Sequence, residues 1–275
     1  MGLLSTSSIP TWLRIVILAV VGLLIFFRGE LGSEDAEVHE SDTRTGVVVS
    51  VPDGAFFEYD RLPRASLTSE SILSAAFVVT DEVFNSELMA PYDILHHSIF
   101  RNNTRYIEPF IVSETGEVLT TFEGIAVAPH YSFDNAPPID ILLIPSTNGS
   151  MSRDLENPRY MEWLREAVAR ARFVVTLCDG AFPLAETGAL NGRIATTFPG
   201  DRDQFARRYP DIDVKYDVRF VHDGKFITSV GGGMSYEPAL YLTELLYGRE
   251  DAIETATGLV WDWNLDAVPH LKVSR

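Results

Sequence analysis

Cys178 is the residue with the clearest capacity for chemistry, because a thiolate is a strong nucleophile and this is the only cysteine in the chain. It directly follows the apolar, β-branched run FVVTL at 173–177 and precedes a helical pattern at 181–190. This order predicts a strand-to-helix turn like the nucleophile elbow of hydrolases, with Gly180 allowing a tight backbone. A helix N-terminus lowers the pKa of a thiol. A lone cysteine is also commonly a small buried hydrophobe, so spacing alone leaves both alternatives open.

The elements that must position Cys178 alternate between buried strands and helices. Strands are expected at 75–80, 106–112, 139–144 and 173–177, and helices at 86–100 and 158–172. This alternation predicts an α/β domain with a doubly wound, mostly parallel sheet and helices on both faces. Reactive groups gather at the carboxyl ends of the strands in such sheets, which is where Cys178 falls.

The pattern changes after residue 213. Strands are expected at 214–218, 219–222 and 226–230, with a hairpin turn at Asp223-Gly224. Three glycines then lead into a helix expected at 236–247, and residues 249–275 are too few and too irregular for a second domain.

Three segments resemble the ThiJ/PfpI superfamily of class I glutamine amidotransferase-like proteins. The segment CDGAFPLAETGALNGRIATTFP (178–199) is similar to the nucleophile block, above all in the branch of isonitrile hydratase and the sensor domains of AraC-type regulators. The segment ELMAPYDIL (87–95) resembles the first helix of the family, with Glu87 four residues before Pro91. The segment FITSVGGGMSYEPALYLTELL (226–246) resembles the strand, glycine-rich turn and helix that close the pocket. The resemblance implies a flavodoxin-like fold.

The resemblance also implies a set of site residues. Glu87, expected to be protonated, would hydrogen-bond the sulfur of Cys178 and act as acid or base, and Asp179 would offer its backbone N–H. A solvated helix carboxylate is the alternative for Glu87. The expected oxyanion and pocket backbone is Thr147, Asn148, Gly149 and Gly180, with Gly231, Gly232 and Gly233 lining the pocket.

Two positions depart from the family pattern. The oxyanion loop usually carries a glycine pair, whereas this chain has Pro145-Ser146-Thr147. The residue after the nucleophile is often His or Thr, but here it is Asp179, whose carboxylate disfavours a thiolate. A solvated or capping role is expected for each of His96, His97, His130 and His222.

Two functions follow as hypotheses. The first is a cysteine-dependent hydratase or hydrolase of a small molecule, with isonitrile hydration as the nearest named chemistry. The alternative is a non-catalytic sensor module that keeps the pocket and binds a small ligand. A protease or amidotransferase is weaker, because no histidine is placed beside the cysteine. No metal or other cofactor is expected, and the resemblance implies a homodimer.

Composition limits the partners. The net charge of −17 and the lack of a basic stripe argue against nucleic acid, and the single cysteine excludes an intrachain disulfide. Residues 1–28 contain an apolar run at 15–27, which predicts an uncleaved single-pass membrane anchor, with a cleaved signal peptide and secretion as the alternative. Residues 29–74 are expected to be an acidic tether with one possible edge strand, and 75–275 the folded domain on the outer side of the membrane.

Overall fold

The computed structural model describes residues 72–97 and 107–274. The strands are β1 (Leu73–Val78), β2 (Ile107–Ser113), β3 (Leu119–Thr120), β4 (Ala126–Val127), β5 (Tyr131–Ser132), β6 (Ile141–Ile144), β7 (Phe173–Leu177), β8 (Ile194–Ala195), β9 (Asp213–Val214), β10 (Phe220–Asp223), β11 (Phe226–Ser229) and β12 (His270–Val273). The helices are α2 (Asn85–His97), α3 (Arg153–Glu156), α4 (Pro158–Arg170), α5 (Ala181–Glu186), α6 (Arg202–Arg208), α7 (Tyr236–Tyr247) and α8 (Arg249–Gly258), with 3-10 turns η2 (Cys178–Gly180), η3 (Gly232–Met234) and η4 (Leu265–Ala267).

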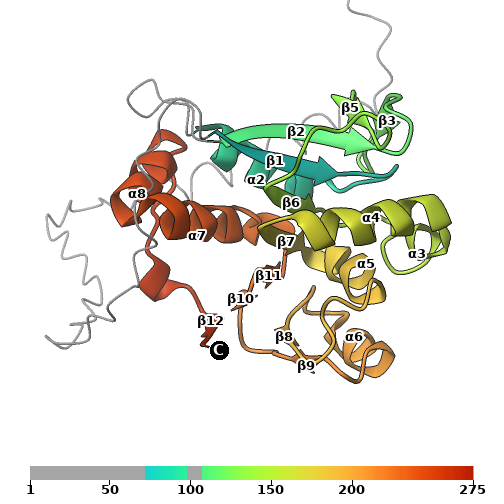
Figure 1. The fold of residues 1–275 in the computed structure, drawn as a ribbon. Coiled ribbons are helices and arrows are strands. Elements are labelled where there is room, and N and C mark those ends of the chain that lie inside the picture. The colour runs from blue at the N-terminus through green and yellow to red at the C-terminus, as the bar shows by residue number, and fades with distance from the viewer. Residues whose placement is uncertain (1–71, 98–106, 275) are drawn as a thin grey trace, which may run out of the picture. The chain divides into compact units, whose positions relative to one another are not determined.

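An eight-stranded sheet in the order β12-β10-β11-β7-β6-β1-β2-β5 forms the centre of the domain (Figure 1). Every neighbouring pair in it is parallel except the β10–β11 hairpin. The central strands are continuous apolar runs, as expected for strands covered on both faces.

Alternate residues of β1 enter two separate cores, because successive side chains of a strand point to opposite faces. Ala75 and Phe77 pack in the core that contains residues of α2, α7 and α8, whereas Ala76 and Val78 pack with residues of α4 and α5. Helices therefore cover both faces of the sheet, and the predicted doubly wound, mostly parallel α/β fold is confirmed.

Most expected elements are found, with differences towards the C-terminus. The strand expected at 214–218 is wrong, because only Asp213 and Val214 are extended and they pair with β8 in a separate two-stranded sheet. Residues 270–273 form β12, which joins the main sheet beside β10. The C-terminal segment is thus part of the domain.

The expected membrane anchor at 1–28 and residues 29–71 of the tether expected at 29–74 lie outside the described residues, and both stay predictions, while Leu73 and Ser74 already belong to β1. Among the residues that the structure describes, no helix combines the length and apolar character needed to span a bilayer.

Candidate functional site

The carboxyl ends of β1, β6 and β7 carry the candidate site. Cys178 directly follows β7 and has a φ of 54°, a left-handed conformation that non-glycine residues seldom adopt. Holding it there costs about 1 to 3 kcal/mol, a strain that is common at functional positions. Gly180 is required for another reason: a Cβ there would overlap the carbonyl oxygen of Ile144 at the end of β6. The turn therefore packs tightly against the neighbouring strand end.

Glu87 reaches this turn from the first turn of α2. It is 3% exposed, and its carboxylate accepts hydrogen bonds from the Gly232 backbone N–H at 2.6 Å and the Ser235 hydroxyl at 3.0 Å. Burial raises the pKa of Glu87 and outweighs the Gly232 and Ser235 donors, which lower it. The structure thus brings together the acid and the thiol that the sequence placed in one pocket.

Gly231 fits between Glu87 and Cys178. Its φ is 72°, and a Cβ built on it would lie 2.5 Å from Glu87 Oε2 and 2.6 Å from the Cys178 backbone nitrogen. Gly232 also has a positive φ, but a Cβ on Gly232 or Gly233 would meet nothing within 4 Å. Of the three glycines, Gly231 is the one whose missing side chain allows the close approach of acid and thiol.

The charge state of Cys178 differs from the sequence expectation. The residue is 8% exposed, and burial, the Glu87 charge and the Asp179 charge, in that order, raise the pKa of its thiol. The expected lowering of the thiol pKa by a helix N-terminus was wrong. Cys178 lies in a short 3-10 turn before α5, and the loss of solvent around the sulfur outweighs the nearby hydrogen-bond donors. The raised pKa favours the neutral thiol over the thiolate.

Asp179 also lies near the sulfur, with its Oδ2 3.8 Å from Cys178 Sγ. Thr197, fully buried, donates its hydroxyl towards the Asp179 carboxylate and the Cys178 carbonyl, each at 3.0 Å. Burial first, and then the negative charge of Asp201, raise the pKa of Asp179 to about 7. Near neutral pH, Asp179 is therefore protonated in a large part of the molecules, which weakens its repulsion of a thiolate.

The raised pKa of Asp179 predicts a pH effect on stability. An unfolded aspartate titrates near roughly 3.9, so between about pH 4 and 7 the folded chain binds more protons and is destabilised as the pH rises. Asp179→Asn cannot ionise and loses this dependence. Thermal unfolding of both proteins at pH 5 and pH 8 should show the variant gaining more relative to the wild type at pH 8. An equal difference at both values would contradict the raised pKa.

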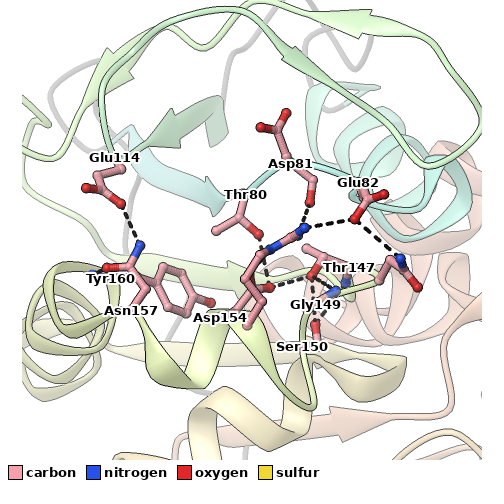
Figure 2. Close-up of polar contacts among 12 residues, drawn as sticks. Thr80, Asp81, Glu82, Glu114, Thr147, Gly149, Ser150, Asp154, Asn157 and Tyr160 are labelled. Atoms are coloured by element: carbon pink, nitrogen blue, oxygen red, sulfur yellow. Dashed lines mark hydrogen bonds and ion pairs between the residues drawn. The ribbon is translucent and has the colours of Figure 1, made fainter.

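The backbone N–H groups of the loop after β6 are hydrogen-bonded to acceptors within the protein (Figure 2). Thr147 N–H donates to Ser150 Oγ at 2.9 Å, and Gly149 N–H donates to Thr147 Oγ1 at 3.0 Å. Asn148 N–H donates to the Glu82 carbonyl at 3.0 Å. The expectation that Thr147, Asn148 and Gly149 offer an oxyanion hole therefore does not match this conformation, because all three N–H groups already have acceptors.

Asp154 holds this loop in place. It is 3% exposed, and its carboxylate accepts from the Thr80 hydroxyl at 3.0 Å and from the Thr147 hydroxyl (Figure 2). The neighbouring Arg153 bridges to Glu82 at 2.8 Å. A buried carboxylate that accepts several hydrogen bonds is held rigidly, so Asp154 fixes the loop after β6 through polar contacts that the sequence did not indicate.

The remaining candidates lie apart from this arrangement. His222 is buried and bonds the Tyr241 hydroxyl at 2.7 Å and the Gly224 carbonyl at 2.8 Å, so the solvated or capping role expected for it was wrong. Two described cavities, of about 280 and 440 Å³, are lined by other residues than Cys178 and Glu87. Among the described residues, no group of three or more His, Cys, Asp or Glu side chains is arranged to hold a metal ion.

Sequence reasoning missed several residues that hold Glu87 and Asp179. Ser235 was inside a quoted segment, and its position two residues after the glycines and before a helix was the available signal. Thr197 lies near the end of the nucleophile block, but no local pattern indicates that its hydroxyl returns to Asp179. Asp201 lies 22 residues beyond Asp179 and carried no signal in sequence.

This fold and this cysteine turn define a class of protein, and comparison identifies it: the chain belongs to the DJ-1/PfpI family, whose model matches residues 73–245. The resemblance stated from the sequence is confirmed.

Named relatives lie within that family. The chain is 28% identical over 151 residues to protein dj-1beta of Drosophila melanogaster, covering 54% of this chain and 79% of the relative. It is 27% identical over 180 residues to isonitrile hydratase of Pseudomonas putida, covering 66% and 75%. Deglycase PfpI of Pyrococcus furiosus is 29% identical over 163 residues, covering 58% and 91%.

Solved structures agree on the fold. A ThiJ/PfpI family protein from Pseudomonas syringae matches with a TM-score of 0.63 at 20% identity, covering 70% of this chain and 76% of that one. Drosophila melanogaster DJ-1beta matches with a TM-score of 0.60 at 23% identity, covering 70% and 100%.

Proposed function

We propose that this protein is a cysteine-dependent hydratase of a small molecule, with isonitrile hydration to a formamide as its nearest named chemistry. Cys178 is the nucleophile and Glu87 the acid and base. The observation that carries the proposal is their arrangement, a strained cysteine at a strand end against a buried carboxylate that Gly232 and Ser235 hold in place. The similarity to isonitrile hydratase over 180 residues supports the choice of reaction.

The reaction can be written with these two residues. The sulfur of Cys178 bonds to the terminal carbon of the isonitrile R–NC while the thiol proton passes through Glu87 to the same carbon, giving the thioimidate R–N=CH–S–Cys. Water then adds across the carbon–nitrogen double bond. The carbon–sulfur bond breaks, the sulfur regains a proton, and the formamide R–NH–CHO leaves. The net change is addition of one water, and the raised pKa values of both groups fit a proton that moves between them.

The backbone N–H groups of the loop after β6 are already hydrogen-bonded, and this favours hydration of an isonitrile over hydrolysis of an ester or amide. Attack on an ester or amide carbonyl creates an oxyanion, which needs free donors about 3 Å away. The N–H groups of Thr147, Asn148 and Gly149 already have acceptors. The first addition to an isonitrile places a proton on carbon and creates no oxyanion, so this site suits it better.

The proposal is tested by incubating the full chain with cyclohexyl isonitrile and following N-cyclohexylformamide by proton NMR. Glu87→Gln should lower the rate by about 10² to 10⁴-fold, the usual contribution of acid–base catalysis. Asp93→Asn is the matched control, because Asp93 lies on the same helix and pairs with His97 instead. Formamide production that Glu87→Gln leaves unchanged would overturn the assigned role of Glu87.

A sensor module is the second candidate, and one observation favours it. The thiol is 8% exposed, and its pKa is raised by burial, as for a structural cysteine. A sensor would bind the isonitrile or its formamide, seen by calorimetry, without any turnover. Turnover that needs Cys178 excludes this candidate.

Two further parts of the proposal rest on the sequence and the family. Association of two copies is implied by the family and is tested by sedimentation equilibrium, where a monomer at micromolar concentration would contradict it. Anchoring through residues 1–28 is tested by carbonate extraction, where release of the intact chain from membranes would contradict it.

A further inference from the structure

Ser146 is a buried polar residue that the proposed reaction has not used. It follows Pro145 in the loop after β6 and is fully buried. Its backbone carbonyl accepts from Phe84 N–H at 3.1 Å, but its hydroxyl has no partner of ordinary hydrogen-bond geometry among the described residues. A buried hydroxyl without a partner costs about 1 to 3 kcal/mol, so its retention calls for an explanation.

The loop at Ser146 packs against the turn that carries the sulfur. Gly180, in the turn of the nucleophile, packs so closely that a Cβ there would overlap Ile144 and lie 3.3 Å from the carbonyl carbon of Pro145, the residue before Ser146. The Ser146 hydroxyl is near enough to the Cys178 thiol to lower its pKa. The close packing of Gly180 on Pro145 therefore sets the loop at Ser146 against the turn of the nucleophile, and the lowering of the thiol pKa by the Ser146 hydroxyl agrees with that placement.

The other donors of this loop are committed. The three N–H groups after Ser146 end on Ser150, Glu82 and Thr147. The Ser146 hydroxyl can rotate, and its proton is free to follow a charge that appears nearby. In this loop the Ser146 hydroxyl can therefore donate to a new acceptor, whereas the three backbone N–H groups already have acceptors.

We infer that Ser146 is a positioning residue that donates its hydroxyl proton to the Cys178 sulfur as the thiol loses its proton. The inference rests on the proposed role of Cys178 as nucleophile. Burial and the carboxylates of Glu87 and Asp179 destabilise the thiolate. A hydroxyl donor and the Asp179 backbone N–H stabilise it. Before proton loss the thiol sulfur is a weak acceptor, which fits the absence of a well-formed hydrogen bond from this hydroxyl.

The test measures the thiolate directly, without any substrate. Because Cys178 is the only cysteine, alkylation by iodoacetamide, followed by the mass of the peptide that contains Cys178, reports on this thiol alone. The alkylation rate is measured from pH 7 to 11 in the wild type, Ser146→Ala and Ser146→Gly, and below the thiol pKa this rate is proportional to the thiolate fraction. Each variant should be alkylated about tenfold more slowly than the wild type at the same pH, as expected for a lost hydrogen bond to a charged group.

Thr176→Val is the matched control. The Thr176 hydroxyl is also fully buried and unpartnered, but it lies on β7 two residues before Cys178. This variant should keep the wild-type alkylation rate, and thermal unfolding shows whether each variant is folded at the assay temperature. If both folded Ser146 variants keep the wild-type alkylation rate, or if Thr176→Val slows alkylation equally, the inference is overturned. The isonitrile assay is separate: hydration with an unchanged alkylation rate rejects only the role of Ser146, and slowed alkylation without hydration rejects only the reaction.

Discussion

Cys178→Ser is expected to lower isonitrile hydration by at least about a thousandfold, because a serine hydroxyl in this site has no base strong enough to make it a nucleophile. Serine replaces the sulfur with a smaller oxygen atom, and its hydroxyl can still form a hydrogen bond with Glu87. Ligand binding should therefore remain. Formamide production is measured by proton NMR, and binding of the formamide by calorimetry.

Thr176→Val controls for a change near the end of β7 that leaves the sulfur intact, and it should keep activity within about twofold. A Cys178→Ser protein that retains more than a tenth of the wild-type rate would mean that water attacks without a covalent step. Loss of binding together with activity would instead indicate that the sulfur builds the pocket.

Gly231→Ala has the largest expected effect on stability. The left-handed backbone alone costs an alanine about 1 kcal/mol, and the new Cβ would also press on Glu87 Oε2 and on the Cys178 backbone. Neither neighbour can move freely, since Glu87 is held by Gly232 and Ser235. We expect a loss of about 3 kcal/mol or more in the free energy of unfolding, as for overpacked or strained positions.

The neighbouring glycines provide graded controls. Gly232→Ala has the positive φ but open space, so about 1 kcal/mol is expected, and Gly233→Ala should be nearly neutral. Urea unfolding of the three variants should rank Gly231 far ahead of the others. Equal losses at all three positions would show that the contact between acid and thiol does not depend on a missing side chain at Gly231.

The sequence predicted the central elements well because their patterns are local. The run at 173–177 is β7 in full, and the helix expected at 236–247 is α7 in full. The strand expected at 214–218 failed, because the pairing with β8 ends at Lys215, and the carbonyls of Tyr216 and Val218 accept hydrogen bonds from the Arg202 side chain instead of a neighbouring strand. The strand β12 was missed because its four residues are only partly buried and gain strand geometry from pairing with β10.

The site was predictable only in part. Glu87 and Cys178 were found through family motifs, since 91 residues separate them and no spacing rule joins them. The direction of the Cys178 pKa could not be read from a strand-to-helix order, because it depends first on burial, then on Glu87 from a distant helix and on the adjacent Asp179. Likewise, the hydrogen bonds that occupy the loop donors at 147–149 depend on Asp154 and Glu82, which a local motif does not report.

The most direct measurement of the central claim is the intact mass of the protein after acid quenching during turnover of cyclohexyl isonitrile. A nucleophilic Cys178 predicts a species heavier by one isonitrile molecule, with the added mass on the peptide that contains Cys178 and absent from Cys178→Ser. Steady formamide production with only the unmodified mass at every quench time, and with no dependence on Cys178, would contradict the claim.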